Sequence, residues 1–259
     1  MYSMRKILLV LFVIPVVFHL QSCTKETGED LSELSLGYNF YPLEVGKYIL
    51  YNVDSIYWDD FLKAEIHHRS QMRYECVDSF LNGEGEVSYV INVTERETPT
   101  SPFVPSDVIH ATISNNRLIT TQSNLDIIQL TFPIENGKTW NGLAMLPLEE
   151  HATSFPERFQ DPEYVFEYSN FDEEYDPGNQ YYKHTVTVNH IDQELNNPEE
   201  DSTAYAYKNY SKEVYAYNVG LIYREIVYWT FQPKGPAGQS GGSGYRKGFG
   251  VTMRAIDNN

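Results

Sequence analysis

One segment of the sequence matches a pattern found around catalytic serines. Residues 238–242 read Gly-Gln-Ser-Gly-Gly, which fits the Gly-x-Ser-x-Gly pattern of a nucleophile elbow. That elbow needs a buried strand before the serine and a helix after it. Here Ser240 follows Pro-Lys-Gly-Pro-Ala and is followed by Gly-Gly-Ser-Gly, a composition typical of a flexible loop. We therefore predict a loop and no catalytic residue at this position, and a protein that is not an enzyme.

Histidines and acidic residues could bind a metal ion, but their spacing is unfavourable. His184 and His190 fall on the same face of an alternating strand, about 20 Å apart, which is too far for one ion. The acidic run at residues 172–176 comes before Pro177-Gly178 and could hold calcium, but it lacks the EF-hand spacing. We predict a solvated acidic turn, no metal site and no cofactor.

Aromatic residues are better candidates for a binding function. Tyrosine occurs 21 times, and a cluster of aromatic residues crowds two predicted neighbouring strands. Aromatic faces beside acids and amides suit stacking on sugar rings, whereas tyrosine in strands also packs well across a sheet. Ligand contact and plain sheet packing both stay open. The cluster consists of Tyr205, Tyr207, Tyr215, Tyr217, Tyr223, Tyr228 and Trp229.

The beginning of the chain is typical of an export signal. Arg5 and Lys6 precede an apolar run over residues 7–20, too short to span a bilayer comfortably. The run ends in Leu20-Gln21-Ser22-Cys23, which resembles the lipobox of bacterial lipoproteins. The resemblance implies cleavage before Cys23, a diacylglycerol on its sulfur and an acylated amino terminus. Two or more acyl chains anchor a protein stably, so we expect attachment to a membrane through Cys23.

The residues after Cys23 suggest where the anchored protein goes. Residues 23–36 are polar and acidic at their start, and we predict a flexible tether there. Lys25 and Glu26, followed by more acids, resemble the export signal of surface lipoproteins in the Bacteroidetes group. That resemblance implies display on the outer face of the outer membrane. An anchor facing the periplasm is the alternative.

Two short segments resemble the Asp-Ser/Thr-apolar glycosylation pattern of exported Bacteroidetes proteins. They are Asp54-Ser55-Ile56 and Asp201-Ser202-Thr203. Ser202 follows an acidic, proline-containing run, so we expect it to be the more exposed acceptor. Ser55 lies within a predicted strand.

Charge and cysteine content exclude several classes of protein. The chain has 19 basic and 36 acidic residues, and loss of residues 1–22 removes Arg5 and Lys6, leaving a net charge of −19. Without a basic cluster, such a chain should repel nucleic acid. If Cys23 carries lipid, Cys76 has no partner for a disulfide, and we expect it to be a small buried hydrophobic residue.

Aromatic and β-branched residues between short turn segments predict an all-β fold. Asn82-Gly83 and Asn115-Asn116 are typical of hairpin turns. No segment after residue 36 has a helical period over three turns. We expect an antiparallel meander that forms a barrel, a curved sheet or a sandwich. The predicted strands cover residues 47–58, 71–80, 86–95, 108–114, 117–122, 125–132, 181–191, 203–217, 220–232 and 245–256.

A short internal repeat bears on the domain organisation. Residues 42–47 read Pro-Leu-Glu-Val-Gly-Lys, and residues 133–138 read Pro-Ile-Glu-Asn-Gly-Lys. Proline ends a strand, glycine closes a turn, and an aromatic follows. We predict a signal peptide over 1–22 and one all-β domain over 37–259. The repeat marks either a turn used twice or two halves that meet near residues 133–160.

Three segments together resemble a group of uncharacterised Bacteroidetes lipoproteins. They cover Phe40–Tyr48, Thr131–Gly142 and Tyr217–Glu225. The resemblance implies an envelope lipoprotein and says nothing of its chemistry. We expect a non-enzymatic surface module that binds glycan or protein. The alternative is a barrel-type carrier or accessory protein for an apolar ligand in the periplasm.

Overall fold

The computed structural model of the chain describes residues 34, 36–146, 157–161, 164–178, 180–234 and 244–259. The chain divides into two compact units, residues 1–31 and residues 32–259. The first unit lies outside the described residues, and so do Cys23, Lys25, Glu26 and Ser240. Within the described part, no helix has the length and apolar character needed to cross a bilayer.

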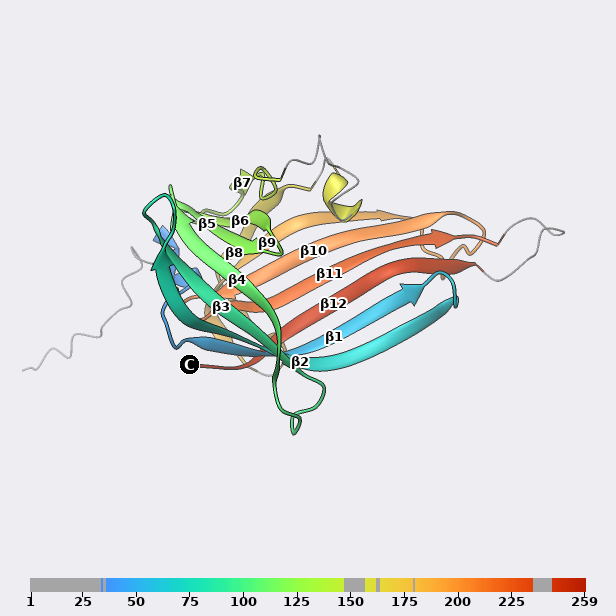
Figure 1. Cartoon of the computed structure of the whole chain (residues 1–259). Helices are drawn as coiled ribbons and strands as arrows, with labels where there is room; N and C mark the ends of the chain where they lie inside the picture. Colours follow the sequence, from blue (N-terminus) through green and yellow to red (C-terminus); the bar gives the residue numbers. More distant parts are fainter. Residues whose placement is uncertain (1–33, 35, 147–156, 162–163, 179, 235–243) are drawn as a thin grey trace, which may run out of the picture. The chain divides into compact units, whose positions relative to one another are not determined.

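The second unit contains one antiparallel sheet of twelve strands, which confirms the predicted all-β antiparallel meander (Figure 1). The spatial order is β6-β5-β4-β3-β2-β1-β12-β11-β10-β9-β8-β7. A 3-10 turn, η1 (Tyr38–Phe40), precedes the sheet, and another, η3 (Glu157–Gln160), lies between β7 and β8. The strands are β1 (Tyr48–Asp59), β2 (Ala64–Leu81), β3 (Val87–Arg96), β4 (Val104–Ser114), β5 (Arg117–Gln122), β6 (Leu125–Thr131), β7 (Thr139–Trp140), β8 (Phe166–Tyr175), β9 (Tyr182–Leu195), β10 (Ala206–Ala216), β11 (Gly220–Gln232) and β12 (Tyr245–Asn258).

The two edges of the sheet approach each other, so one part of the sheet is nearly closed. The backbone N–H of Ile128 on β6 donates to the carbonyl of Gly142 at 2.9 Å. Trp140 Nε1 on β7 donates to the Ile128 carbonyl at 2.8 Å. The Tyr168 hydroxyl on β8 accepts from the Thr131 N–H and donates to the Thr131 carbonyl. One backbone bond and three side-chain bonds thus replace part of a strand ladder, and they satisfy edge groups that would otherwise be open.

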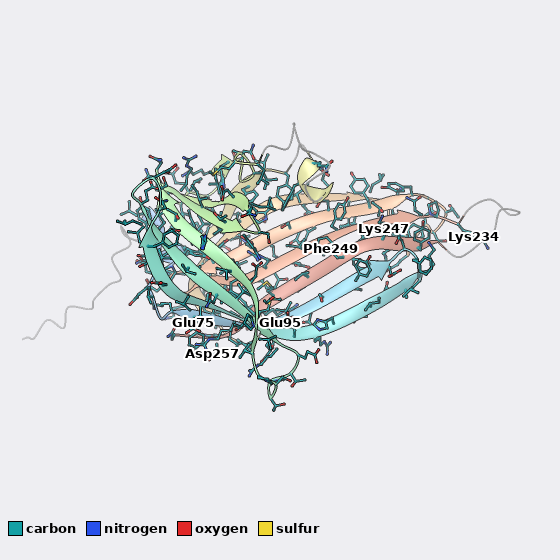
Figure 2. The ribbon with its side chains drawn as sticks, viewed as in Figure 1. Glu75, Glu95, Lys234, Lys247, Phe249 and Asp257 are labelled. Atoms are coloured by element: carbon teal, nitrogen blue, oxygen red, sulfur yellow. The ribbon has the colours of Figure 1, made fainter. Side chains whose placement is uncertain are left out.

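The sheet therefore has two regions. In the curled half, β2–β6 bend round to meet β7 and β8 and enclose a core that contains Phe40, Tyr168 and Tyr215. In the extended half, the ends of β1, β2, β10, β11 and β12 run past that closure (Figure 1). Figure 2 places Lys234 and Lys247 toward the extended end and Glu75 and Asp257 at the other end of the sheet.

The repeated segments form the same turn twice. In the first, Lys47 N–H donates to the Glu44 carbonyl, and Gly46 N–H donates to the Cys76 carbonyl on β2. In the second, Lys138 N–H donates to the Glu135 carbonyl, and Gly137 N–H donates to the Tyr168 carbonyl on β8. Both glycines have positive φ, 97° and 78°, which favours glycine at this position. Each turn opens one run of six consecutive strands, β1–β6 and β7–β12.

Several strand predictions were incomplete. The predicted strand ranges included neither β7 nor β8, and residues 171–175 belong to β8 rather than to an acidic turn. Asn170 and Asp172 in β8 have positive φ, and the pairing with β9 shifts register there, which explains the irregular pattern. The predicted turns at Asn82 and at Asn115-Asn116 are confirmed. Leu34, inside the predicted tether, is buried in the core.

Candidate functional site

A buried ion pair lies at the centre of the sheet. Glu213 on β10 and Arg224 on β11 are direct cross-strand partners, and Arg224 Nε donates to Glu213 Oε1 at 2.7 Å. The glutamate side chain is 4% exposed and the arginine side chain 20%. Because a charge removed from water needs partners, the pair must be supported by further hydrogen bonds.

Two more side chains support the carboxylate. The Tyr215 hydroxyl donates to Glu213 Oε2, and His190 Nε2 lies 3.7 Å from the same oxygen. His190 is held in place by Ser211 Oγ at 2.9 Å from Nδ1 and by stacking on Phe166 at 3.9 Å. Burial raises the pKa of Glu213, but Arg224, His190 and the hydrogen bonds from Tyr215 and Arg224 outweigh burial and lower it. Glu213 is therefore ionised at neutral pH.

Arg224 also forms part of the wall of a cavity in the curled half, which we call the inner cavity. Its volume is about 70 Å³, about half that of a cavity that holds a benzene ring. Strands from both six-strand runs contribute to the wall. The lining residues are Tyr41, Pro42, Leu43, Lys47, Tyr48, Ile49, Tyr51, Tyr74, Cys76, Ile91, Ile109, Thr120, Gln122, Gln129, Tyr215, Val219, Gly220, Leu221 and Arg224.

The polar groups of this wall are unequally satisfied. The Tyr51 hydroxyl donates to the Leu221 carbonyl at 2.7 Å, and Gln122 Nε2 donates to Asp107 at 2.7 Å. Gln129 Nε2 donates to Thr120 Oγ1 at 3.1 Å, but its buried Oε1 has no hydrogen-bond partner in the described part of the chain. A buried acceptor left alone costs free energy and marks a place where a water or ligand donor fits.

Cys76 has little chemical reactivity in this wall. Its side chain is buried, which confirms the predicted small buried residue. Burial, with Asp78 nearby, raises the pKa of the thiol. Because the thiolate is the reactive form, Cys76 stays protonated and inert at neutral pH.

The predicted aromatic cluster is divided over different surroundings. Tyr215 is buried against Glu213, and Tyr217 is half-buried and accepts a hydrogen bond from Asn39. Tyr205 and Tyr207 form a ring pair at 6.4 Å beside the extended half. On β11, Tyr223 and Trp229 fall on one face and Tyr228 on the opposite face. The seven residues therefore do not form one continuous surface.

A different aromatic group lies on one face of the extended half. Trp58 on β1 and Trp229 on β11 both pair with Gly248 on β12, so the indoles flank a residue without a side chain. Gly248 has a φ of 146°, and a Cβ there would lie 2.1 Å from the Tyr228 carbonyl oxygen. The glycine thus fixes how closely β11 and β12 approach and leaves space between the indoles.

Next to these indoles lies a second hollow, which we call the outer groove, of about 500 Å³. Arg246 lies over the Trp229 ring at 4.9 Å and pairs with Glu199 at 3.2 Å and Glu65 at 3.6 Å. Trp58 Nε1 donates to Glu65 at 2.9 Å. The groove is lined by Trp58, Lys63, Ala64, Glu65, Pro198, Glu199, Ser202, Phe231, Lys234, Gly244, Tyr245 and Arg246.

The remaining candidates occupy separate places. Ser202 is exposed in the β9–β10 loop, and Asp201 accepts hydrogen bonds from the backbone and side chain of Thr203. Ser55 lies inside β1, with its hydroxyl 3.4 Å from the His68 carbonyl. Among the described residues, no group of histidine, cysteine and acidic side chains has the arrangement of a metal site.

Glu213, Arg224 and Gln129 escaped the sequence analysis. Each is polar in a strand, and strands normally carry such residues on a solvent face. Arg224 directly follows Leu221, Ile222 and Tyr223, and Glu213 directly precedes Val214 and Tyr215. The sequence does contain a signal for a buried ion pair: two adjacent strands each carry one charged residue, of opposite sign, next to an apolar run.

The comparisons with known proteins assign the chain to no family. No protein family and no curated protein matches the sequence. Among solved structures, the chain is similar to a protein described as exported, with a YmcC-like fold, from Bacteroides fragilis NCTC 9343. The match has 13% identity and a TM-score of 0.40, and it covers 84% of this chain and 99% of that chain. By its own structure, the chain is an all-β protein with one twelve-stranded sheet.

Proposed function

We propose that the protein is a lipid-anchored, non-enzymatic binding module of the cell envelope, and that the outer groove binds a neutral glycan. One observation carries this proposal. An aromatic wall, including Trp58 and Tyr245, lies beside a fixed set of charged hydrogen-bonding groups. Sugar rings present one apolar face and a rim of hydroxyls, so an aromatic surface next to carboxylate and guanidinium groups matches both parts.

The charged groups of the outer groove are held in place before any ligand arrives. Arg246 is positioned by Glu65, Glu199 and the Trp229 ring, and the Trp58 indole is positioned by Glu65. Preorganised groups lose less conformational entropy on binding than mobile ones. The strong negative charge of the chain disfavours an acidic polysaccharide and favours a neutral one.

Binding of neutral oligosaccharides to the mature protein tests the groove directly. We expect Trp58→Ala to weaken binding at least tenfold, because an aromatic stacking surface is lost. Tyr57→Ala is the matched control, since Tyr57 is the neighbouring aromatic of β1 and faces the opposite side of the sheet. Equal binding by the two variants, or no binding of any neutral glycan, would exclude the outer groove as a glycan site.

The anchor is supported by the lipobox at Leu20–Cys23 and is part of the same proposal. Lys25 and Glu26 support display on the cell surface. Metabolic labelling with a fatty acid should mark the wild-type protein and not Cys23→Ala. Protease added to intact cells should remove the protein if it faces outward, and protection from protease would favour a periplasmic orientation.

A carrier for an apolar ligand is less well supported. Such a carrier needs a cavity lined by residues such as valine, isoleucine and phenylalanine. The inner cavity is small, and its wall includes Arg224, Gln129 and several tyrosines. Ser202, exposed and next to the outer groove, is the better supported of the two glycosylation candidates. Mass spectrometry of the protein from its own cells would detect a glycan there.

A further inference from the structure

The inner cavity needs an occupant that the outer groove does not explain. The two hollows have no lining residue in common. The wall of the inner cavity contains several polar groups, and Gln129 Oε1 among them has no hydrogen-bond partner in the described part of the chain. A ligand of this cavity must satisfy these groups together.

The first requirement is a hydrogen-bond donor. Gln129 Oε1 is buried and has no partner in the described part of the chain, while Nε2 of the same amide donates to Thr120. In this arrangement Nε2 is already used, and Oε1 is the atom of the amide left without a partner. A group that enters the cavity can therefore satisfy Oε1 only by presenting an N–H or O–H.

The second requirement is a hydrogen-bond acceptor. Arg224 uses Nε for Glu213, so its terminal nitrogens are the part left to bind a ligand. Tyr74 lines the same wall as this guanidinium. Tyr41 lines the same cavity as Arg224, and the hydrogen bond shown for Tyr41 in the described part of the chain uses its backbone N–H and not its hydroxyl. A carbonyl oxygen would accept from these donors.

Charge and size narrow the ligand further. Because Glu213 is ionised beside Arg224, the pair carries no net charge and attracts an anionic ligand only weakly. Lys47 is the other cation of the wall, and its ammonium group is exposed and donates to the Asn259 carbonyl at 3.4 Å, so water screens its charge. A cavity of about 150 Å³ accommodates a benzene ring, so about 70 Å³ suits a group of roughly three or four non-hydrogen atoms. We propose that the inner cavity binds a small neutral amide group, with its N–H on Gln129 Oε1 and its carbonyl oxygen toward Arg224 and Tyr41.

Three compounds of equal size test this proposal with the full mature chain. Acetamide has a donor and an acceptor, acetone has the acceptor alone, and acetate adds a charge. In NMR titrations we expect acetamide to shift signals of the cavity wall with an affinity on the order of 1–10 mM, the range for so small a ligand. Acetone should bind at least fivefold more weakly, and acetate should not bind.

Two variants show which groups are responsible. Gln129→Met keeps an unbranched side chain and removes Oε1, so the preference for acetamide over acetone should vanish. Tyr41→Phe should weaken acetamide about fivefold. Gln193→Met is the matched control, since Gln193 lies on β9 outside the cavity wall. The thermal midpoint of each variant shows that it is folded.

The proposal is overturned by any of three results. Acetamide and acetone could bind equally to the wild-type chain, which would mean that Oε1 is not used. Acetate could bind best, which would mean that a cation of the wall, Arg224 or Lys47, is free to pair with an anion. A crystal soaked in acetamide could contain only water in the cavity. Each of these leaves glycan binding in the outer groove unaffected, because the Trp58 test does not involve the cavity.

Discussion

Two of the arginine–carboxylate pairs of the molecule have nearly equal contact distances but lie in contrasting surroundings. In the curled half, Arg224 Nε lies 2.7 Å from Glu213, and the side chains are 20% and 4% exposed. In the extended half, Arg69 Nε lies 2.9 Å from Asp54, and the side chains are 89% and 47% exposed. Contact distance alone therefore does not reveal what a pair contributes. Exposure to solvent decides how much a pair contributes to stability. Water screens the attraction between the exposed charges. In the buried pair, loss of one partner leaves the other charge buried and uncompensated, which is costly.

The same contrast appears in how the two halves use aromatic residues. The curled half buries its tyrosines around polar groups, as with Tyr51 and Tyr215. The extended half has solvent on much of both faces, and its aromatics occur with exposed charges, as with Lys63 over Tyr245. A buried polar network fixes one arrangement and resists change. The open half tolerates variation, which suits a surface that contacts external ligands.

Alkaline pH should produce the largest effect and should act through the curled half. Burial raises the pKa of Tyr41, Tyr51, Tyr74 and Tyr215 above the ordinary value near 10. A tyrosine whose pKa is higher in the folded chain stabilises the fold fully below its unfolded pKa. That contribution is lost as pH rises toward the folded pKa. Each such tyrosine should cost about 1.4 kcal/mol per pH unit above about pH 10.

We expect these tyrosines to ionise together with loss of the fold, in one steep transition. Tyrosinate absorbance and near-ultraviolet circular dichroism, followed against pH, should change at the same pH. If tyrosinate formed gradually while the dichroism of the fold persisted, the tyrosines of the curled half would be accessible to water. That result would contradict the view that the curled half buries its tyrosines and differs in this from the extended half.

The two arginine pairs allow the next largest test. Arg224→Met leaves Glu213 charged and buried, and it should cost about 3–5 kcal/mol of unfolding free energy. Arg69→Met is the matched change in the extended half and should have no measurable effect. Denaturant unfolding measures both. The double variant Glu213→Gln with Arg224→Met should regain part of the loss, because no uncompensated charge remains. Equal stability of the two single variants would contradict our view of the buried pair.

How far the sequence predicts this molecule follows the same division. In the curled half, apolar alternation identified β3, β5 and β6, because one face of each strand is buried. In the extended half, residues 64–69 of β2 are exposed on both faces and carry no alternation, so that part was missed. These residues are part of the strand because their backbone groups pair with β1 along the whole segment.

The candidate sites were harder to predict for a related reason. Trp229 was predicted as a candidate, but Trp58 and Arg246 join it only through pairing across β12, far away in sequence. The inner cavity combines residues of eight strands and two loops, and no local pattern identifies such a set. The repeated Pro-x-Glu-x-Gly-Lys turn was recognisable, since its function is entirely local: glycine allows the positive φ, and the turn docks on one neighbouring strand.

The smallest expected effect comes from a pair of hydroxyl deletions within the inner cavity. Tyr51→Phe removes a donor from the buried Leu221 carbonyl and should cost about 1 kcal/mol. Tyr41→Phe removes a hydroxyl that bonds to no other described residue, so stability should stay within about 0.3 kcal/mol of wild type. Guanidinium unfolding with unchanged m-values would establish the difference.

This last comparison also tests the state of the cavity without any added ligand. If Tyr41→Phe were as costly as Tyr51→Phe, the Tyr41 hydroxyl would have to be bonded to ordered water in the free protein. An amide would then have to displace that water, and its affinity would fall accordingly. If Tyr41→Phe is neutral for stability yet weakens acetamide, the hydroxyl serves binding rather than folding. If the inner cavity is a ligand site, we expect it to contain a polar group, such as the Tyr41 hydroxyl, that does not stabilise the fold.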